Sequence, residues 1–331
     1  MARGQLFPPK SKQVSVLAGG VGAAKFIRGL VRVIPPEHLT VVVNTGDDEM
    51  FFGLHVSPDV DTVMYTLAGE VHPGQGWGLR DESFRVLEAL TRFYGKPWFG
   101  LGDRDLATHL YRTDQLRAGK KLSDLTADIS KRFGVKSRIL PMSDDRVRTF
   151  VKIRGRDAMP FQEYFVKGRA RGLVEKIELR GIEEARPLPS VIDGIRTSAT
   201  TILAPSNPFV SLGPIFGLRG VRDALASARD RVVAISPIVG GKTIKGPADK
   251  MLRGLGLEVS ALGIARLYKD IVGTFDLDQV ERNYVEPIRG LGMRVVATDT
   301  IMTTPAKSAR LAGIIMRTIM KDSSRLSYRV I

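Results

Sequence analysis

Aspartates stand in two short stretches of the chain that could hold a metal ion. Asp47 and Asp48 follow an apolar run, and Asp59 and Asp61 lie just after Ser57. Mg²⁺ prefers oxygen ligands, often one or two carboxylates together with phosphate oxygens of a substrate. The pattern favours a functional role for Asp47, Asp48 and Asp61, although the first two could simply shape a turn. We interpret Asp59 as stabilising the N-terminus of its helix through the helix dipole.

A glycine-rich stretch, Val16-Leu-Ala-Gly-Gly-Val-Gly-Ala-Ala-Lys25, could approach a phosphate group. A dinucleotide-binding fingerprint would need a third glycine where Lys25 stands, and no acidic residue ends the next predicted strand, so NAD is disfavoured. Gly20 and Gly22 still let the backbone approach a diphosphate at the N-terminus of a helix that we expect to begin near Ala23. Lys25 would add a charge on the first turn. The alternative, a tight turn with no ligand, is about equally supported.

Two other patterns suggest chemistry more weakly. Gly240-Gly-Lys-Thr243 looks like the end of a phosphate-binding P-loop, but Ser236 stands where the first glycine belongs, so a surface loop or a substrate-facing turn is favoured. His109 follows Asp105 by four residues, which predicts a weak pair on a helix surface. The chain has no Cys, and its four His are far apart, which excludes thiolate catalysis and disfavours a histidine metal site.

The composition indicates a folded protein with an excess of positive charge. The 331 residues are 43% apolar, and 50 Lys and Arg against 35 Asp and Glu give a net charge of +15. Such a charge favours phosphorylated partners. The basic residues are scattered rather than clustered, so we expect no nucleic acid as the main partner. With no signal-peptide pattern and no apolar run of about 20 residues, we expect a cytoplasmic protein that does not span a membrane.

Short apolar runs alternate with helical patterns along the chain. This order predicts an α/β fold, a Rossmann-like and mostly parallel sheet with helices on both faces. The helix after Ser57 is well marked, since Ser57 can cap it and Pro58 suits its first turn. The predicted strands are Gln13 to Ala18, Leu39 to Asn44, Ser137 to Pro141, Thr200 to Pro205, Arg231 to Ser236 and Met293 to Thr298.

The fold is expected to carry two additions. We predict a flexible segment at 1–12 and a Rossmann-like body at 13–146 and 186–331. The body includes a helical excursion of three helices at 82–134, the second capped by Asp103. Residues 147–185 alternate apolar and polar side chains in three stretches, one of them Phe161 to Lys167, which predicts a small antiparallel β insertion.

Ligands of an open parallel sheet bind at the carboxyl ends of its strands, so the residues that follow the strands are the best candidates for a site. Five such stretches are rich in small, polar or acidic residues. They are 19–22, 45–48, 142–145, 206–213 and 237–243.

In order along the chain, these stretches resemble the 2-phospho-L-lactate transferase family, CofD or FbiA, which builds the deazaflavin coenzyme F(420). The resemblance covers residues 14 to about 305. The matching motifs are Gly19-Gly-Val-Gly-Ala-Ala-Lys, Val43-Asn-Thr-Gly-Asp-Asp, Ser57-Pro-Asp-Val-Asp-Thr, Trp77-Gly, Gly100-Leu-Gly-Asp-Arg-Asp-Leu-Ala-Thr-His109, Leu140-Pro-Met-Ser-Asp-Asp145, Phe161-Gln-Glu, Ala204-Pro-Ser-Asn-Pro, Ser211-Leu-Gly-Pro and Ser236-Pro-Ile.

The resemblance implies a transferase reaction. The primary ribityl hydroxyl of the deazaflavin alcohol Fo would attack the phosphorus that bears the lactyl group in a guanylylated 2-phospholactate, or in its enolpyruvyl counterpart, and GMP would leave. Such a transfer depends on positioning and on charge neutralisation, which carboxylate-held Mg²⁺ and backbone amides supply. A homodimer is also implied.

The resemblance assigns roles residue by residue. Asp47, Asp48 and Asp61 would be the catalytic and Mg²⁺-binding acids, with Asp61 also orienting the attacking hydroxyl. Gly100 stands where archaeal relatives can carry a lysine, which leaves no side-chain contact there. The residues implied in substrate binding are Gly19, Gly20, Gly22, Lys25, Asp61, Gly100, Asp103, Ser206, Asn207, Ser211 and Gly213.

A second interpretation belongs to a different class. YvcK-like proteins are similar in the glycine loop but act as regulators that bind nucleotide sugars. They are not expected to carry the segments Gly102-Asp-Arg-Asp105 and Pro141-Met-Ser-Asp-Asp145 found here. Since a fold alone does not fix an activity, ligand choice distinguishes the two: the regulator would bind a UDP-sugar and not Fo.

Overall fold

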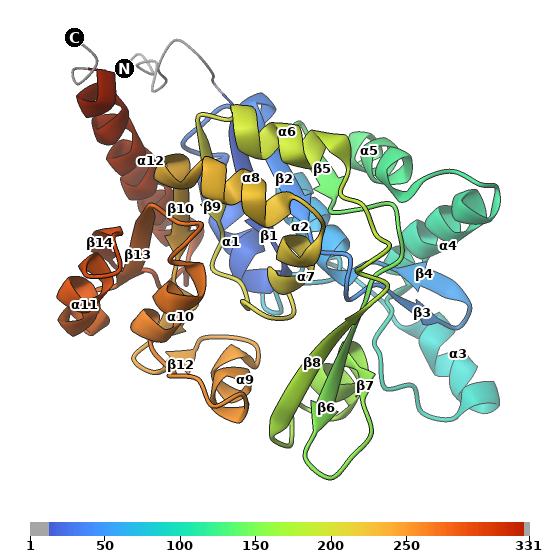
Figure 1. The fold of residues 1–331 in the computed structure, drawn as a ribbon. Helices are drawn as coiled ribbons and strands as arrows, with labels where there is room; N and C mark the ends of the chain where they lie inside the picture. The colour runs from blue at the N-terminus through green and yellow to red at the C-terminus, as the bar shows by residue number, and fades with distance from the viewer. Residues whose placement is uncertain (1–12, 328–331) are drawn as a thin grey trace.

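A parallel sheet of seven strands forms the centre of the protein (Figure 1). The computed structural model describes residues 13–327, with side chains to residue 319; the segment predicted to be flexible, 1–12, lies outside them. The strand order is β14-β13-β10-β9-β1-β2-β5. Their bounds are β1 Val14–Ala18, β2 Leu39–Val43, β5 Arg138–Pro141, β9 Thr200–Leu203, β10 Val232–Ile235, β13 Thr274–Asp278 and β14 Arg294–Thr298.

Six of these strands are the six predicted, which confirms the α/β, Rossmann-like fold. The prediction missed β13, whose sequence Thr-Phe-Asp-Leu-Asp holds two aspartates and therefore lacks the apolar run of a buried strand. Both acids are buried because hydroxyls of the next segment satisfy them: Thr298 donates to Asp276 and Thr300 to Asp278.

Helices cover both faces of the sheet (Figure 1). Alternate residues of β1 show why, since Val16 and Ala18 pack into one apolar core and Leu17 into the other. The first core is closed by α1 (Gly20–Leu30), α2 (Pro58–Ala68), α5 (Leu122–Arg132) and α12 (Pro305–Ser327). The second is closed by α6 (Pro189–Thr197), α7 (Gly213–Gly217), α8 (Val221–Ser227) and α10 (Ala261–Tyr268).

The helical excursion contains the three predicted helices, α3 (Arg85–Tyr94), α4 (Asp103–Arg117) and α5. A short hairpin, β3 (Glu49–Phe51) with β4 (Leu54–Val56), precedes α2 and lies against α4 (Figure 1). The predicted cap of α4 is wrong. The Asp103 carboxylate instead accepts from the backbone N–H of Arg85 and Val86 and so caps α3, while Glu82 accepts from Arg104 and Asp105 at the start of α4.

Three antiparallel strands lie in the range predicted as a β insertion: β6 (Arg148–Ile153), β7 (Met159–Pro160) and β8 (Val174–Arg180). The stretch Phe161 to Lys167 was wrongly predicted as a strand, because Glu163–Lys167 forms a π-helix. Its aromatic side chains repeat at helical spacing: the rings of Phe161 and Phe165 stack with centroids 5.4 Å apart. The division into domains stays a prediction.

Gly240-Gly241 is the turn of a hairpin rather than a P-loop. Ile238–Val239 (β11) pairs with Lys242–Thr243 (β12), and both glycines have positive φ, as a tight two-residue turn requires. The remaining helices are α9 (Ala248–Gly254) and α11 (Val285–Arg289), with 3₁₀ turns at Pro36–His38, Arg229–Arg231 and Gln279–Tyr284. No helix in the described range is long and apolar enough to cross a membrane.

Candidate functional site

A cavity of about 600 Å³ opens at the carboxyl ends of β1, β2, β9, β10 and β14. This is the edge where a parallel sheet binds ligands, and β1 and β9 form the switch point at which the helices change face. Ten of the residues predicted for the site line the cavity, whereas Asp48, Asp103 and Gly213 do not. Those that line it are Gly19, Gly20, Gly22, Lys25, Asp47, Asp61, Gly100, Ser206, Asn207 and Ser211.

The glycine loop forms one wall of the cavity. Its residues are glycines because neighbouring atoms leave no room for side chains. A Cβ on Gly19 would lie 2.6 Å from that of Ser211, and one on Gly22 would lie 2.5 Å from the carbonyl oxygen of Pro205. Helix α1 begins at Gly20, three residues before the predicted start. The Gly20 N–H donates to Asp59 Oδ1 at 2.8 Å, and the Gly19 N–H donates to Ser206 Oγ at 3.3 Å.

Two lysines meet at this wall. Lys25 lies on the second turn of α1, and Lys245 reaches the cavity from the loop after β12, where its Nζ donates to the carbonyl oxygen of Gln75. Burial, together with the charges of Lys245 and Arg28, lowers the pKa of Lys25. Within the described residues, neither Lys25 nor Lys245 forms an ion pair with a carboxylate. An anion in the cavity would relieve this repulsion.

Two buried carboxylates, Asp59 and Asp47, line the cavity, and Asp59 contacts the glycine loop. Asp59 accepts from Gly20 and from Asn44 Nδ2, which lies 3.0 Å away, and burial raises its pKa to about 6. Burial and the charge of Asp59 raise the pKa of Asp47 well above its ordinary value. Asp47 Oδ1 is buried without a hydrogen-bond partner. Asp59, interpreted from sequence as a helix-end residue, therefore also belongs to the cavity, and its carboxylate binds the glycine loop instead of its own helix.

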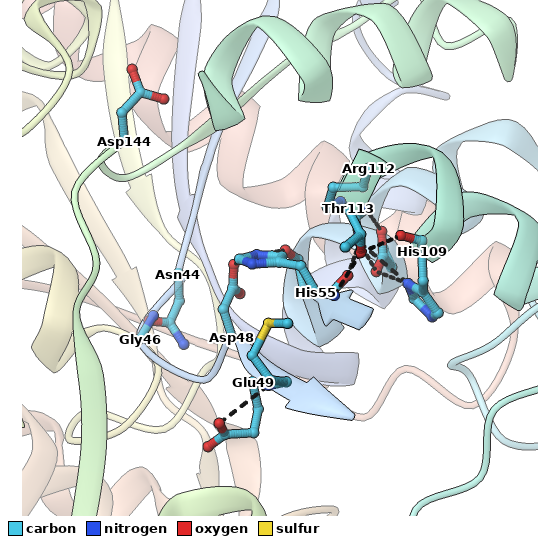
Figure 2. Close-up of polar contacts among 12 residues, drawn as sticks. Asn44, Gly46, Asp48, Glu49, His55, His109, Arg112, Thr113 and Asp144 are labelled. Carbon is cyan, nitrogen blue, oxygen red and sulfur yellow. Dashed lines mark hydrogen bonds and ion pairs between the residues drawn. The ribbon is translucent and has the colours of Figure 1, made fainter. Parts of the chain in front are cut away.

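Asp48 lies outside the cavity lining, in a polar cluster at the base of the β3-β4 hairpin. Figure 2 shows its carboxylate beside the imidazole of His55. Asp48 Oδ2 accepts from Ser57 Oγ at 2.7 Å and lies 3.0 Å from His55 Nε2. Ser57 occupies the N-cap position of α2, but its hydroxyl binds Asp48 rather than the helix. Burial raises the pKa of Asp48, and Oδ1 is left without a partner.

Asp61 is neutralised by a cation in the protein itself. Arg112 of α4 binds both of its carboxylate oxygens, Oδ1 through Nη2 and Oδ2 through Nη1. The Arg112 side chain is 1% exposed, and the carboxylate raises its pKa against the effect of burial. Figure 2 shows Arg112 and His109 projecting side by side from α4.

His109 and Asp105 do not form the surface pair predicted from their spacing. His109 is 1% exposed, and its Nε2 lies 3.3 Å from Asp105 Oδ1 inside the protein. Tyr65 of α2 donates its hydroxyl to the same oxygen at 2.6 Å. Burial acts to raise the pKa of Asp105, but His109, Tyr65 and Arg112 together hold it below its ordinary value.

A second cavity of about 270 Å³ adjoins the first. Gln75, Trp77, Gly78, Gly100 and Asp105 line both. A Cβ on Gly100 would meet nothing closer than Phe84, at 3.9 Å, so this position has room for a side chain.

A divalent cation fits some of the predicted acids better than others. Asp47 and Asp48 each keep a buried oxygen that lacks a partner, as a metal ligand would. Asp61 would join them only if Arg112 released one oxygen. No group of three or more His, Cys, Asp or Glu side chains in the described part of the chain is arranged to hold a metal by itself. A bound Mg²⁺ would therefore complete its ligands with substrate oxygens and water.

Sequence reasoning missed several lining residues. Thr300–Thr303 follow β14 and could have been found, since they too lie beyond the end of a strand. Phe161 and Gln162 stand in the matching motif Phe161-Gln-Glu but were not predicted for the site. Only the packing of the insertion against the body places them and Phe165 there.

The comparisons with known proteins agree with these motifs. A model of the family described as 2-phospho-L-lactate transferase CofD matches residues 14–310. A phosphoenolpyruvate transferase of Streptomyces griseus subsp. griseus is 44% identical over 305 residues, covering 91% of this chain and 96% of the relative. A 2-phospho-L-lactate transferase of Methanosarcina mazei is 37% identical over 302 residues, covering 91% and 99%.

Solved structures support the fold at much lower identity. A Bacillus halodurans protein described as a member of the upf0052 family is similar with a TM-score of 0.58 and 16% identity, covering 95% of this chain and 100% of that chain. This likeness concerns the fold alone.

Proposed function

The chain belongs to the 2-phospho-L-lactate transferase family and is a CofD-type transferase, and from this premise we propose its substrates. The acceptor is the deazaflavin alcohol Fo, and the donor is a guanylylated 2-phospholactate or its enolpyruvyl counterpart. The ribityl hydroxyl attacks the phosphorus that bears the acid, and GMP leaves, in the biosynthesis of coenzyme F(420). The higher identity to the phosphoenolpyruvate transferase favours the enolpyruvyl donor.

The meeting of Lys25 and Lys245 beside the glycine loop carries this proposal. Two cations without carboxylate partners, next to the N-terminus of α1, form a site for the diphosphate of the donor. Gly19 and Gly22 line the cavity, so the diphosphate would lie along their backbone. Ser206, Asn207 and the segment to Gly213 would contact the guanosine part.

The acidic residues of the site are proposed to bind the metal and to orient the acceptor. Asp47 and Asp48 would hold Mg²⁺, which would neutralise charge on the transferring phosphoryl group. Asp47 is the better placed of the two, since it lines the cavity. Asp61 is proposed as a third acid and as a group that orients the attacking hydroxyl. Its bonds to Arg112 must change for either role, and unchanged turnover of Asp61→Asn would remove Asp61 from the mechanism.

The experiment that tests the proposal is GMP release. The protein is mixed with Fo, Mg²⁺ and each guanylylated donor in turn, with omission of Fo and addition of EDTA as controls. Release that needs both Fo and the metal supports the transferase, and the faster donor identifies the acid. No release with either donor, together with UDP-sugar binding, would support the nucleotide-sugar-binding regulator instead.

Two further expectations belong to the proposal. A homodimer is expected, and sedimentation of the purified protein measures it. A cytoplasmic location is expected as well, and fractionation of cells that produce the protein tests it.

A further inference from the structure

Asp105 lies where the two cavities meet. It is on the first turn of α4 and lines both the larger and the smaller cavity. A ligand that extends from one cavity into the other would therefore pass the shared residues, this carboxylate among them. Gly100, on the same boundary, leaves the passage free of a side chain.

The protein keeps one oxygen of this carboxylate occupied and the other available. Tyr65 donates its hydroxyl to Oδ1, and His109 Nε2 is 3.3 Å from the same atom. Oδ2 has no hydrogen-bond partner among residues 13–319. A carboxylate held in this way is oriented by the protein and still has a full acceptor for a ligand hydroxyl.

The neighbouring contacts also hold the carboxylate in its charged form. Arg112 Nη1 lies 3.3 Å from His109 Nδ1, and a guanidinium group only donates, so Nδ1 is the acceptor. In the neutral imidazole the proton is then on Nε2, the nitrogen 3.3 Å from Asp105 Oδ1, although Nε2 makes no hydrogen bond within the described residues. Burial and nearby negative charges raise the pKa of Tyr65 well above its ordinary value, so its hydroxyl stays a donor. The low pKa of Asp105 agrees with this arrangement.

Asp61, by contrast, has no free oxygen. Both of its oxygens accept from Arg112, and the pair is buried, so a hydroxyl would have to displace a charged hydrogen bond to reach it. Asp105 meets no such competitor at Oδ2. Of the two acids, Asp105 therefore has the oxygen that a substrate hydroxyl can reach, and it competes with Asp61 for the hydroxyl-orienting role proposed above for Asp61.

We propose that Asp105 binds the attacking hydroxyl of the acceptor through Oδ2 and takes its proton during transfer. The inference rests on the proposed function and names a catalytic residue for it. The hydroxyl oxygen forms a bond to the phosphorus that bears the acid, and its proton moves to Asp105. The bond from that phosphorus to the bridging oxygen breaks, and its electrons leave with GMP as a phosphate anion. The proton then passes from Asp105 to water.

The test compares Asp105→Asn with a matched control. The amide keeps an oxygen for Tyr65 but cannot take a proton. We expect kcat to fall by about 10² to 10³, as for loss of a general base, with GDP affinity within threefold of wild type. Asp128 offers the control: Tyr111 donates to it at 2.7 Å in the same kind of pair, but Asp128 lies outside both cavities. Asp128→Asn should transfer at the wild-type rate.

The outcomes separate this inference from the proposed function. A wild-type protein that releases GMP normally, with Asp105→Asn within threefold of its kcat, overturns the role of Asp105 and leaves the function standing. A wild-type protein that releases no GMP with either donor overturns the proposed function and this inference with it. Tyr65→Phe gives a second measurement, because it removes one orienting donor. It should reduce kcat less than Asp105→Asn does, and an equal or larger loss would assign the effect to Tyr65.

Discussion

Replacement of Asp276 by asparagine should stabilise the protein, and more so as the pH rises. The Asp276 side chain is buried in the centre of β13, and both of its oxygens receive a single hydroxyl, Thr298 Oγ1, at 3.0 Å. Burial, with a contribution from Asp278, raises its pKa from an ordinary 3.8 to about 8. Asparagine has nearly the same shape and carries no charge.

The sign follows from proton binding. Between about pH 4 and pH 8 the folded protein keeps a proton on Asp276 that the unfolded chain releases, so this residue makes stability fall as the pH rises. One pKa unit corresponds to about 1.4 kcal/mol. The shift therefore destabilises the folded state by about 4 kcal/mol at pH 7 and by about 2 kcal/mol at pH 5, and Asp276→Asn should remove both. For a chain of this length, about 4 kcal/mol corresponds to roughly 6 °C in Tm.

The assay is thermal and urea denaturation of both proteins at pH 5, 6, 7 and 8. Asp193→Asn on the exposed side of α6 is the control for loss of a carboxylate, and it should change stability by less than about 0.5 kcal/mol. The difference between Asp276→Asn and wild type should widen with pH up to about 8. A constant difference, or a variant less stable than wild type at pH 8, would refute the reasoning.

Three further changes test the site. Asp47→Asn removes a buried carboxylate with a free oxygen, so the Mg²⁺ concentration needed for half-maximal turnover should rise at least about tenfold, as a metal titration would show. Gly22→Ala places a Cβ 2.5 Å from the carbonyl oxygen of Pro205, so it should lower stability by about 1 to 3 kcal/mol and weaken GDP binding. Calorimetry measures both effects, and Gly74→Ala, whose Cβ would make only ordinary contacts, serves as the control. Arg112→Gln leaves Asp61 buried without its cation and should lower the free energy of unfolding by about 3 to 5 kcal/mol, a loss that adding Asp61→Asn should partly restore. Equal stability of the single and double variants would contradict that account.

The sequence was sufficient for six of the seven strands of the sheet and for the edge that carries the cavity. Strands such as β1 and β2 are buried on both faces, so they appear as continuous apolar runs, and their order with helices implies parallel pairing. The polar residues after them then fall at one edge of the sheet, as predicted for the glycine loop and for Asp47. Strand β13 escaped detection because its acids depend on hydroxyls of a later segment, which local patterns do not reveal.

Tertiary structure decided which side chain meets which, because those contacts join distant segments. The sequence determined that four aspartates lie close along the chain, but it could not show which partner each would have. They are Asp47, Asp48, Asp59 and Asp61. Packing places Asp48 beside His55 outside the cavity and pairs Asp61 with Arg112 at the cavity lining. Asp47 and Asp59 line the cavity without such a cation, and a different acid, Asp105, lines both cavities. The residue types and the ends of the strands follow from short-range sequence patterns. The contact partners of the site residues depend on how α4, the insertion and the C-terminal segments fold over the same edge of the sheet.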